Sequence, residues 1–184
     1  MEFCSRSADW AKTTIADYGN GDDPEGLFSG LIIDHAGNFY GSSDGGGTAN
    51  IGSVYEVTRS GAGWTTTLLH SFTSLATGAY ANGGLLMDQA GNLYGTAPSG
   101  GASGGGIVFE LSPSNGGWNY SVIANLIGPP GLNGPQGSLT MDGAGNLYGT
   151  TFGDGAFQCG NVFKLTSSGG AMDLHRPVRF HLRR

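Results

Sequence analysis

Three aspartates at one repeated position are the first residues in this chain whose type and spacing could do chemistry. Asp34, Asp88 and Asp142 lie 54 residues apart, each at the start of a D-x-x-G-N turn. Such a carboxylate could hold a cation, but calcium loops place several carboxylates at alternate positions, and here one stands in each turn. We therefore interpret each aspartate as a structural acceptor for the backbone N–H groups of its turn, and expect asparagine to replace it at little cost.

Aromatic residues recur at the same spacing and have two interpretations. They could form a platform for a sugar, or they could pack between adjacent units, with the tyrosine hydroxyl hydrogen-bonded at the edge. Equal spacing favours packing. The residues are Tyr40, Tyr94 and Tyr148, with Trp10, Trp64 and Trp118.

Two histidines, His35 and His70, each occur in a single unit. Neither has a partner at the spacing of a catalytic triad or a metal site, so we expect both to be exposed. The glycine run Gly45–Gly47 precedes a predicted strand and lacks the helix N-terminus of a phosphate loop. We therefore predict no catalytic residue, no metal and no cofactor.

The segments that position these residues repeat without insertion. GLLMDQAGNLYGT (84–96) corresponds to GLIIDHAGNFYGS (30–42) and to SLTMDGAGNLYGT (138–150). Each unit predicts four short strands, the first of which is apolar at nearly every position and is expected to be buried on both sides (31–34, 85–88 and 139–142). The pattern predicts an all-β fold, a β-propeller-like array of four-stranded antiparallel blades.

The repeat phase divides the chain into a single repeat domain, 1–170, and a basic non-repeat tail, 171–184. The domain comprises a partial repeat (1–29), two repeats (30–83 and 84–137) and a second partial repeat (138–170). Met172 stands where the next tryptophan is expected, so we expect the last unit to lack its outer strand, while Trp10–Tyr18 supplies an unattached one. About three and a half blades are too few for a closed ring, which predicts an incomplete or open propeller whose end faces favour self-association.

Composition excludes some partners. Glycine makes up 36 of the 184 residues and suits turns, and residues 1–170 hold four basic and thirteen acidic residues, a net charge of −9. This balance predicts repulsion from nucleic acid and anionic lipid, and no apolar run is long enough to span a bilayer. Cys4 and Cys159 occupy different phases of the repeat. They could form one disulfide, but two separate thiols are favoured.

The repeated strings also resemble a known family. GLIIDHAGNFYGSSDGGG and GLLMDQAGNLYGTAPSGG are each followed by G-x-V-[FY]-E-[VL] and by a strand that begins with GW. Over residues 2–170 this pattern resembles the Gloeo/Verruco (GloVer) tandem repeat. The resemblance implies a secreted or surface bacterial protein of many repeats, with a propeller-like structure and no established activity.

Loops that differ between the units are the predicted place for binding. In an up-and-down sheet the connections from the second to the third strand and from the fourth to the next first strand lie at one edge. Their candidate ligand-binding residues are Asp22, Asp23, Glu25, Asp44, Tyr80, Phe152, Asp154 and Phe157. The sequence predicts a non-enzymatic scaffold or binding module for a glycan or a protein. The alternative is a propeller-type hydrolase or lyase with its site on these loops.

Overall fold

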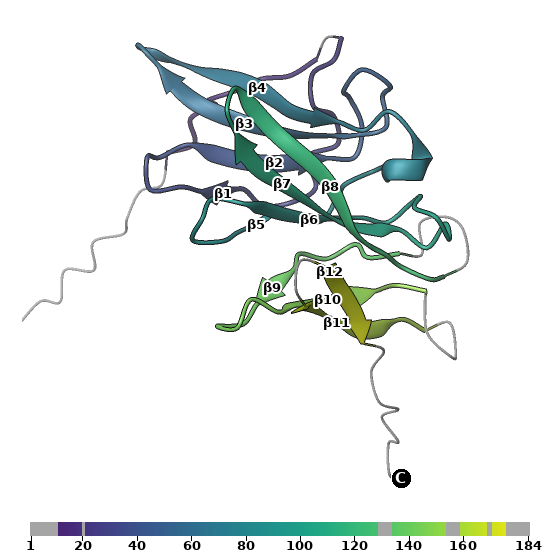
Figure 1. Ribbon diagram of the computed structural model, residues 1–184. Helices are drawn as coiled ribbons and strands as arrows, with labels where there is room; N and C mark the ends of the chain where they lie inside the picture. The colour runs from purple at the N-terminus through teal and green to yellow at the C-terminus, as the bar shows by residue number, and fades with distance from the viewer. Residues whose placement is uncertain (1–10, 20, 129–133, 154–158, 169–170, 176–184) are drawn as a thin grey trace, which may run out of the picture.

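The chain folds into three antiparallel sheets that follow one another along the sequence, from blue through green to yellow in Figure 1. The computed structural model describes residues 11–19, 21–128, 134–153, 159–168 and 171–175. Within each sheet the four strands pair in chain order. Sheet 1 comprises β1 (Ile32–Ile33), β2 (Phe39–Ser43), β3 (Ser53–Ser60) and β4 (Gly63–Ser71). Sheet 2 comprises β5 (Leu86–Met87), β6 (Leu93–Ala97), β7 (Ile107–Ser114) and β8 (Gly117–Asn125). Sheet 3 comprises β9 (Thr140–Met141), β10 (Leu147–Thr151), β11 (Asn161–Ser168) and β12 (Ala171–His175).

The three sheets share one register, which confirms the predicted all-β fold with four antiparallel strands per unit. The first hairpin pairs Ile33 with Phe39 in sheet 1 and Met87 with Leu93 in sheet 2. A β-bulge falls at the same place in sheets 1 and 2, between Val54 and Tyr55 and at the corresponding step of β7. Since no residue is inserted between the units, identical turns produce identical pairing.

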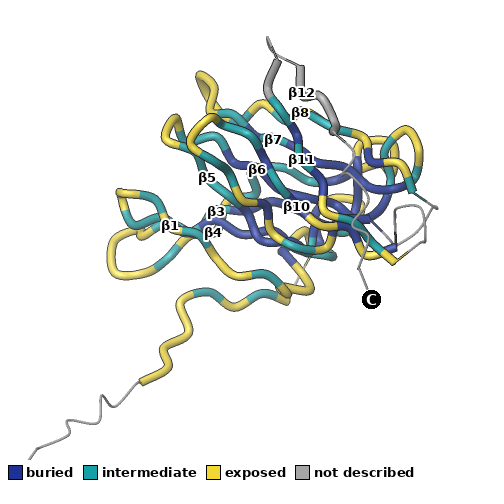
Figure 2. The backbone as a smooth tube through the Cα atoms, turned by 90° about the horizontal axis from the view of Figure 1, so that it is seen from below, coloured by how far each residue is buried: buried dark blue, intermediate teal, exposed yellow. Residues whose placement is uncertain are grey.

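The sheets pack face to face around two hydrophobic cores. Alternate residues of a strand point to opposite faces, so Phe109 on β7 belongs to the core shared with sheet 1, while Val108 belongs to the core shared with sheet 3. Figure 2 shows the buried positions concentrated in the strands, with the exposed positions in the connections and in the segment that leads into sheet 1. Each inner face therefore carries a continuous apolar surface.

A glycine in the second strand makes room for an aromatic ring of the third. Gly95 lies opposite Phe109 in the register of β6 and β7, and a Cβ added at Gly95 would run into the Phe109 ring. That ring is fully buried and packs edge-on against Phe72, with their centroids 5.5 Å apart. The same constraint holds at Gly41 below Tyr55, which explains the repeated YG dipeptide.

The expectation that the first strand is buried on both sides is wrong. That strand is two residues long in every sheet, and Leu86 and Met87 are half-buried. In sheet 1 both Leu31 and Ile33 are exposed, whereas Leu85 is buried. The difference arises because sheets 2 and 3 have a sheet in front of this position, and among the described residues sheet 1 has none.

Both expectations about the chain ends are also wrong where the structure tests them. β12 pairs with β11, from Lys164 opposite His175 to Ser168 opposite Ala171, so sheet 3 has its fourth strand. Strand pairing uses backbone groups that every residue except proline provides, and a tryptophan at position 172 is not required. At the other end, residues 11–19 form no strand, while Trp10 lies outside the described residues.

The segment before sheet 1 nevertheless keeps the phase of the repeat. Tyr18 packs edge-on against Tyr55 with their ring centroids 6.0 Å apart, and its hydroxyl lies 3.1 Å from Thr66 Oγ1. Phe72 makes the corresponding contact with Phe109 in sheet 2. Tyr18 therefore packs against sheet 1 at the place where the last residue of a preceding unit would pack.

Helical structure in the described part of the chain is limited to one 3₁₀ turn, η1 (Leu75–Thr77). The Ser74 side chain begins it by accepting a hydrogen bond from the Ala76 N–H. None of the described helical structure is long and apolar enough to cross a membrane.

The contact between Gly95 and Phe109 predicts that Gly95→Ala lowers the free energy of unfolding by about 1–3 kcal/mol, because the added methyl must displace a fully buried ring. Chemical denaturation measures this change. Gly117→Ala is the matched control, since a Cβ at Gly117 meets nothing within 4 Å. Equal effects of the two substitutions would contradict the steric explanation.

Candidate functional site

Each repeated aspartate uses both carboxylate oxygens to close its own turn. Asp88 Oδ1 accepts hydrogen bonds from the N–H groups of Ala90 and Asn92, both at 2.9 Å. Asp88 Oδ2 accepts from Asn92 Nδ2 at 2.8 Å and from the Tyr94 hydroxyl at 3.1 Å. The other two units repeat these contacts around Asp34 and Asp142. The carboxylate thus joins the first turn to the second strand.

The hydrogen bonds favour the charged form of these carboxyl groups. Desolvation alone would raise the pKa of Asp88, but the donors from Asn92, Tyr94 and Ala90 together outweigh it and hold that pKa below its usual value. The Asn146 side chain and N–H, followed by the Tyr148 hydroxyl, lower the pKa of Asp142. A carboxylate that already accepts three N–H donors and contacts a tyrosine hydroxyl has little capacity left for a cation.

The tyrosine hydroxyl in sheets 1 and 2 lies between two carboxylates. Tyr40 Oη is 2.8 Å from Glu56 Oε1 and 3.1 Å from Asp34 Oδ2. Burial, followed by these two acids, raises the pKa of Tyr40. In sheet 3 a lysine replaces the glutamate, and Lys164 Nζ lies 5.5 Å from the centre of the Tyr148 ring. The glutamates were missed at the sequence level, although their place opposite the tyrosine in the register could have indicated them.

The aromatic rings of Tyr40 and Tyr94 face the two cores of the molecule. Tyr40 and Tyr94 are buried, and the Tyr40 ring packs edge-on against Trp118 of sheet 2, with their centroids 6.2 Å apart. A ring buried between two sheets presents no face to a sugar. The structure therefore places Tyr40 and Tyr94 as contacts between sheets, while Tyr148 is half-buried on sheet 3.

One of the two histidines differs from its prediction. His35 is exposed, as predicted, but His70 is half-buried between sheets 1 and 2. Its ring stacks on Tyr120 with 3.8 Å between centroids and 5° between planes. His70 Nε2 is buried, and no described residue offers it a hydrogen bond. Desolvation lowers the pKa of His70 to about 4. The sequence did not indicate this, because alanine holds the position in the other units.

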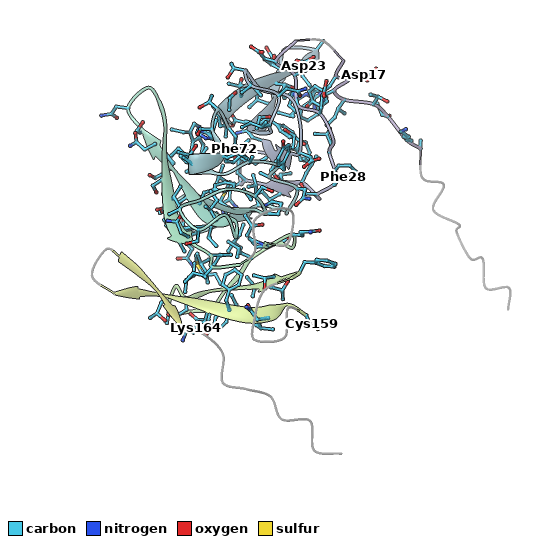
Figure 3. The ribbon with its side chains drawn as sticks, turned by 90° about the vertical axis from the view of Figure 1, so that its right-hand side faces the viewer. Asp17, Asp23, Phe28, Phe72, Cys159 and Lys164 are labelled. Atoms are coloured by element: carbon cyan, nitrogen blue, oxygen red, sulfur yellow. The ribbon has the colours of Figure 1, made fainter. Side chains whose placement is uncertain are left out.

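Four of the eight candidate loop residues lie together beside sheet 1. Glu25 and Gly45 form an isolated antiparallel bridge, which sets the segment with Asp22, Asp23 and Glu25 against Asp44. The Gly47 N–H donates to the Asp22 carbonyl at 3.0 Å. Desolvation raises the pKa of Asp44. Figure 3 shows Asp17, which the sequence analysis did not single out, near Asp23 at the same end of the molecule.

The remaining loop candidates are separate from this group. The Tyr80 N–H donates to the Ile51 carbonyl at 2.8 Å, and Tyr80 has a positive φ of 62°. Phe152 is 69% exposed, and its N–H donates to the Gly134 carbonyl at 3.1 Å. Asp154 and Phe157 lie outside the described residues, as does Cys4, while Cys159 is exposed.

Backbone contacts hold the variable loops together at one edge of the sheets. The bridge between Glu25 and Gly45 recurs one unit later between Ala79 and Ser99. Each connection into a sheet therefore lies against the connection between the second and third strands of that same sheet. Among the described residues, no three His, Cys, Asp or Glu side chains gather in a way that could hold a metal ion.

The fold and its repeated turn define a module of stacked sheets with a constant edge and a variable edge. The family model of the Gloeobacter/Verrucomicrobia repeat matches residues 6–179, so the chain belongs to this family. No curated protein and no solved structure matches the chain significantly.

Because both carboxylate oxygens of Asp88 accept hydrogen bonds, we expect Asp88→Asn to cost more stability than the sequence alone predicts. Asp88→Ala should lower the free energy of unfolding by about 1–2 kcal/mol through unpaired turn donors, and Asp88→Asn by about 1 kcal/mol, because the new NH₂ faces the donors of Asn92 and Tyr94. Chemical denaturation measures both changes. A calcium-dependent rise in melting temperature that Asp88→Asn removes would contradict a structural role.

The half-buried His70 predicts a loss of stability in acid. Its folded pKa of about 4 lies below the ordinary 6.5, so the unfolded chain binds the proton first as the pH falls. The stabilisation is complete above pH 6.5 and is lost between 6.5 and about 4, by about 1–2 kcal/mol after allowance for partial exposure. His70→Phe should flatten this part of the stability curve, measured by denaturation across pH. His35→Phe should leave it unchanged, and an unaltered curve for His70→Phe would contradict the prediction.

Proposed function

We propose that this protein is a non-enzymatic binding module of a secreted or surface bacterial protein, built as a β-propeller-like array, and that it binds its partner with the variable loop edge. Its membership of the repeat family supports the module. The loop edge supports the binding, because loops that differ between units lie on a scaffold whose register does not.

The observation that carries this proposal is that the residues of one edge repeat in every unit, whereas the residues of the other edge differ between units. At one edge the repeated polar residues are hydrogen-bonded within their own turn, as at Asp34 and Asn38. At the other edge, backbone bonds fix the loops while their side chains differ between units. The repeated side chains hold the turn, and the side chains that differ between units supply the recognition.

The chemistry of the loop edge favours a glycan or a protein as the partner. Phe152 offers an exposed aromatic ring, which suits a sugar face or an apolar side chain. The acids Asp22, Asp23 and Glu25 add hydrogen-bond acceptors that suit hydroxyl groups and cationic side chains. The same acids repel nucleic acid.

Binding to glycan and peptide arrays tests this function. A ligand found on either array should bind at least about tenfold more weakly to Phe152→Ala or to Asp22→Asn/Asp23→Asn, because a ring or an acceptor pair is lost. His35→Ala, at the opposite edge, is the matched control and should bind as the native chain does. Loss of binding in the control alone would contradict the loop edge, and turnover of an ester, lactone or glycoside would favour the enzymatic alternative.

A further inference from the structure

Each end of the described array exposes some positions that are buried inside it, although Tyr55 and Val57 of sheet 1 are buried as their counterparts Phe109 and Leu111 are. We call the face of sheet 1 that carries Leu31 and Ile33 the leading face, and the face of sheet 3 that carries Tyr148, Thr150 and Val162 the trailing face. Sheet 1 stands at the upper end and sheet 3 at the lower end in Figure 1. The same face of each of the other two sheets is covered inside the molecule. The surface that covers it there indicates which surface would cover the exposed end face.

The trailing face is covered wherever another sheet follows. Val54 and Val108 are both 0% exposed, whereas Val162 at the same repeat position is 55% exposed. Ser42 and Thr96 are buried, whereas Thr150 is exposed. These residues face the next sheet in sheets 1 and 2, and in sheet 3 they face outward.

The leading face shows the same contrast at the other end. Leu85 and Leu139 are 4% and 6% exposed, because each faces the sheet before it, whereas Leu31 is 48% exposed. Ile33 is 59% exposed, while Met87 at the same repeat position is half-buried and packs against the core shared with sheet 1. Large aliphatic side chains exposed together on a sheet face indicate a contact surface.

The internal joints show how a trailing face binds a leading face. Ser42 Oγ donates to the Gly83 carbonyl at 2.6 Å, and Thr96 Oγ1 donates to the Gly137 carbonyl at 3.1 Å. One repeat further, Thr150 Oγ1 is the donor, and the acceptor with the right phase is the carbonyl of Ser29. A second contact follows the same rule: since Tyr40 packs on Trp118, Tyr148 requires Trp64.

We propose that two copies of this chain associate head to tail, the trailing face of each docking on the leading face of the other. Each junction then repeats contacts seen within one copy: Thr150 donates to the Ser29 carbonyl, as Ser42 and Thr96 do at both internal joints, and Tyr148 packs on Trp64, as Tyr40 packs on Trp118 at the first. On sheet 1, Tyr18 already occupies the place that Phe72 occupies on sheet 2. Two copies bring six sheets together, within the roughly four to eight blades of closed propellers, and a heterologous contact that closes needs no further copy.

The charges at the two ends favour head-to-tail association over contact between like ends. Figure 3 shows Asp17 and Asp23 at the end of the molecule opposite Lys164. Lys164 stands where sheets 1 and 2 carry Glu56 and Glu110, so the sign of the charge is reversed on the trailing face. Joining two leading faces would bring acid to acid, whereas joining unlike ends would not.

Light scattering and sedimentation of the native chain test the association. The expected mass is twice 18.8 kDa, and Val162→Asp or Ile33→Asp should each raise the dissociation constant at least about tenfold, because each buries an unpaired charge at both junctions. Both side chains are exposed in the single copy, so the far-UV circular dichroism should not change, while loss of the pair should lower the melting temperature only at concentrations where the native chain is paired. Leu75→Asp is the matched control, exposed to a similar degree but outside both faces.

Mixing the two variants separates a head-to-tail contact from other contacts. Val162→Asp keeps an intact leading face and Ile33→Asp an intact trailing face, so the mixture should form a one-to-one pair while each variant alone remains a single copy. A native chain that stays a single copy at high concentration overturns the proposal. So does a pair that survives either substitution or is lost in Leu75→Asp.

Discussion

The constraint on which the structure depends is that its sheets are apolar on both faces. Sheet 2 shows this most fully, since Phe109 lies in the core toward sheet 1 and its neighbour Val108 in the core toward sheet 3. Because consecutive residues of one strand belong to different cores, a shift of register would disturb both at once. The hydrophobic effect therefore fixes the register of each strand and the order of the sheets together.

The polar residues that first suggest chemistry serve this packing. The aspartate closes its turn and also accepts a hydrogen bond from the tyrosine hydroxyl, so a ring buried between two sheets has its one polar atom satisfied at the edge. Turn, strand and core are thereby connected through three side chains, Asp34, Asn38 and Tyr40. This connection repeats at the constant edge of every unit, so its three residues are tied to the fold.

The sequence predicts those features that the repeat itself encodes. The period, the four strands, the closing role of Asp88 and the packing of Tyr94 follow from local pattern and equal spacing. The sequence does not predict features that depend on whether a neighbouring sheet is present. Leu31 and Leu85 have the same residue type and repeat position, but Leu31 is exposed and Leu85 is buried. The stacking of His70 on Tyr120 joins two units through residues that are not repeated, and β12 forms by backbone pairing where the side-chain pattern ends.

The hydrogen bond from Ser42 or Thr96 to the following unit has a consequence for the history of such proteins. Its acceptor is a main-chain carbonyl, which every amino acid supplies, so the joint does not require two side chains to change in concert. A segment of 54 residues copied by unequal recombination would therefore meet its new neighbour through a contact that already works. Gene duplication can lengthen the array before natural selection has refined any residue of the added unit.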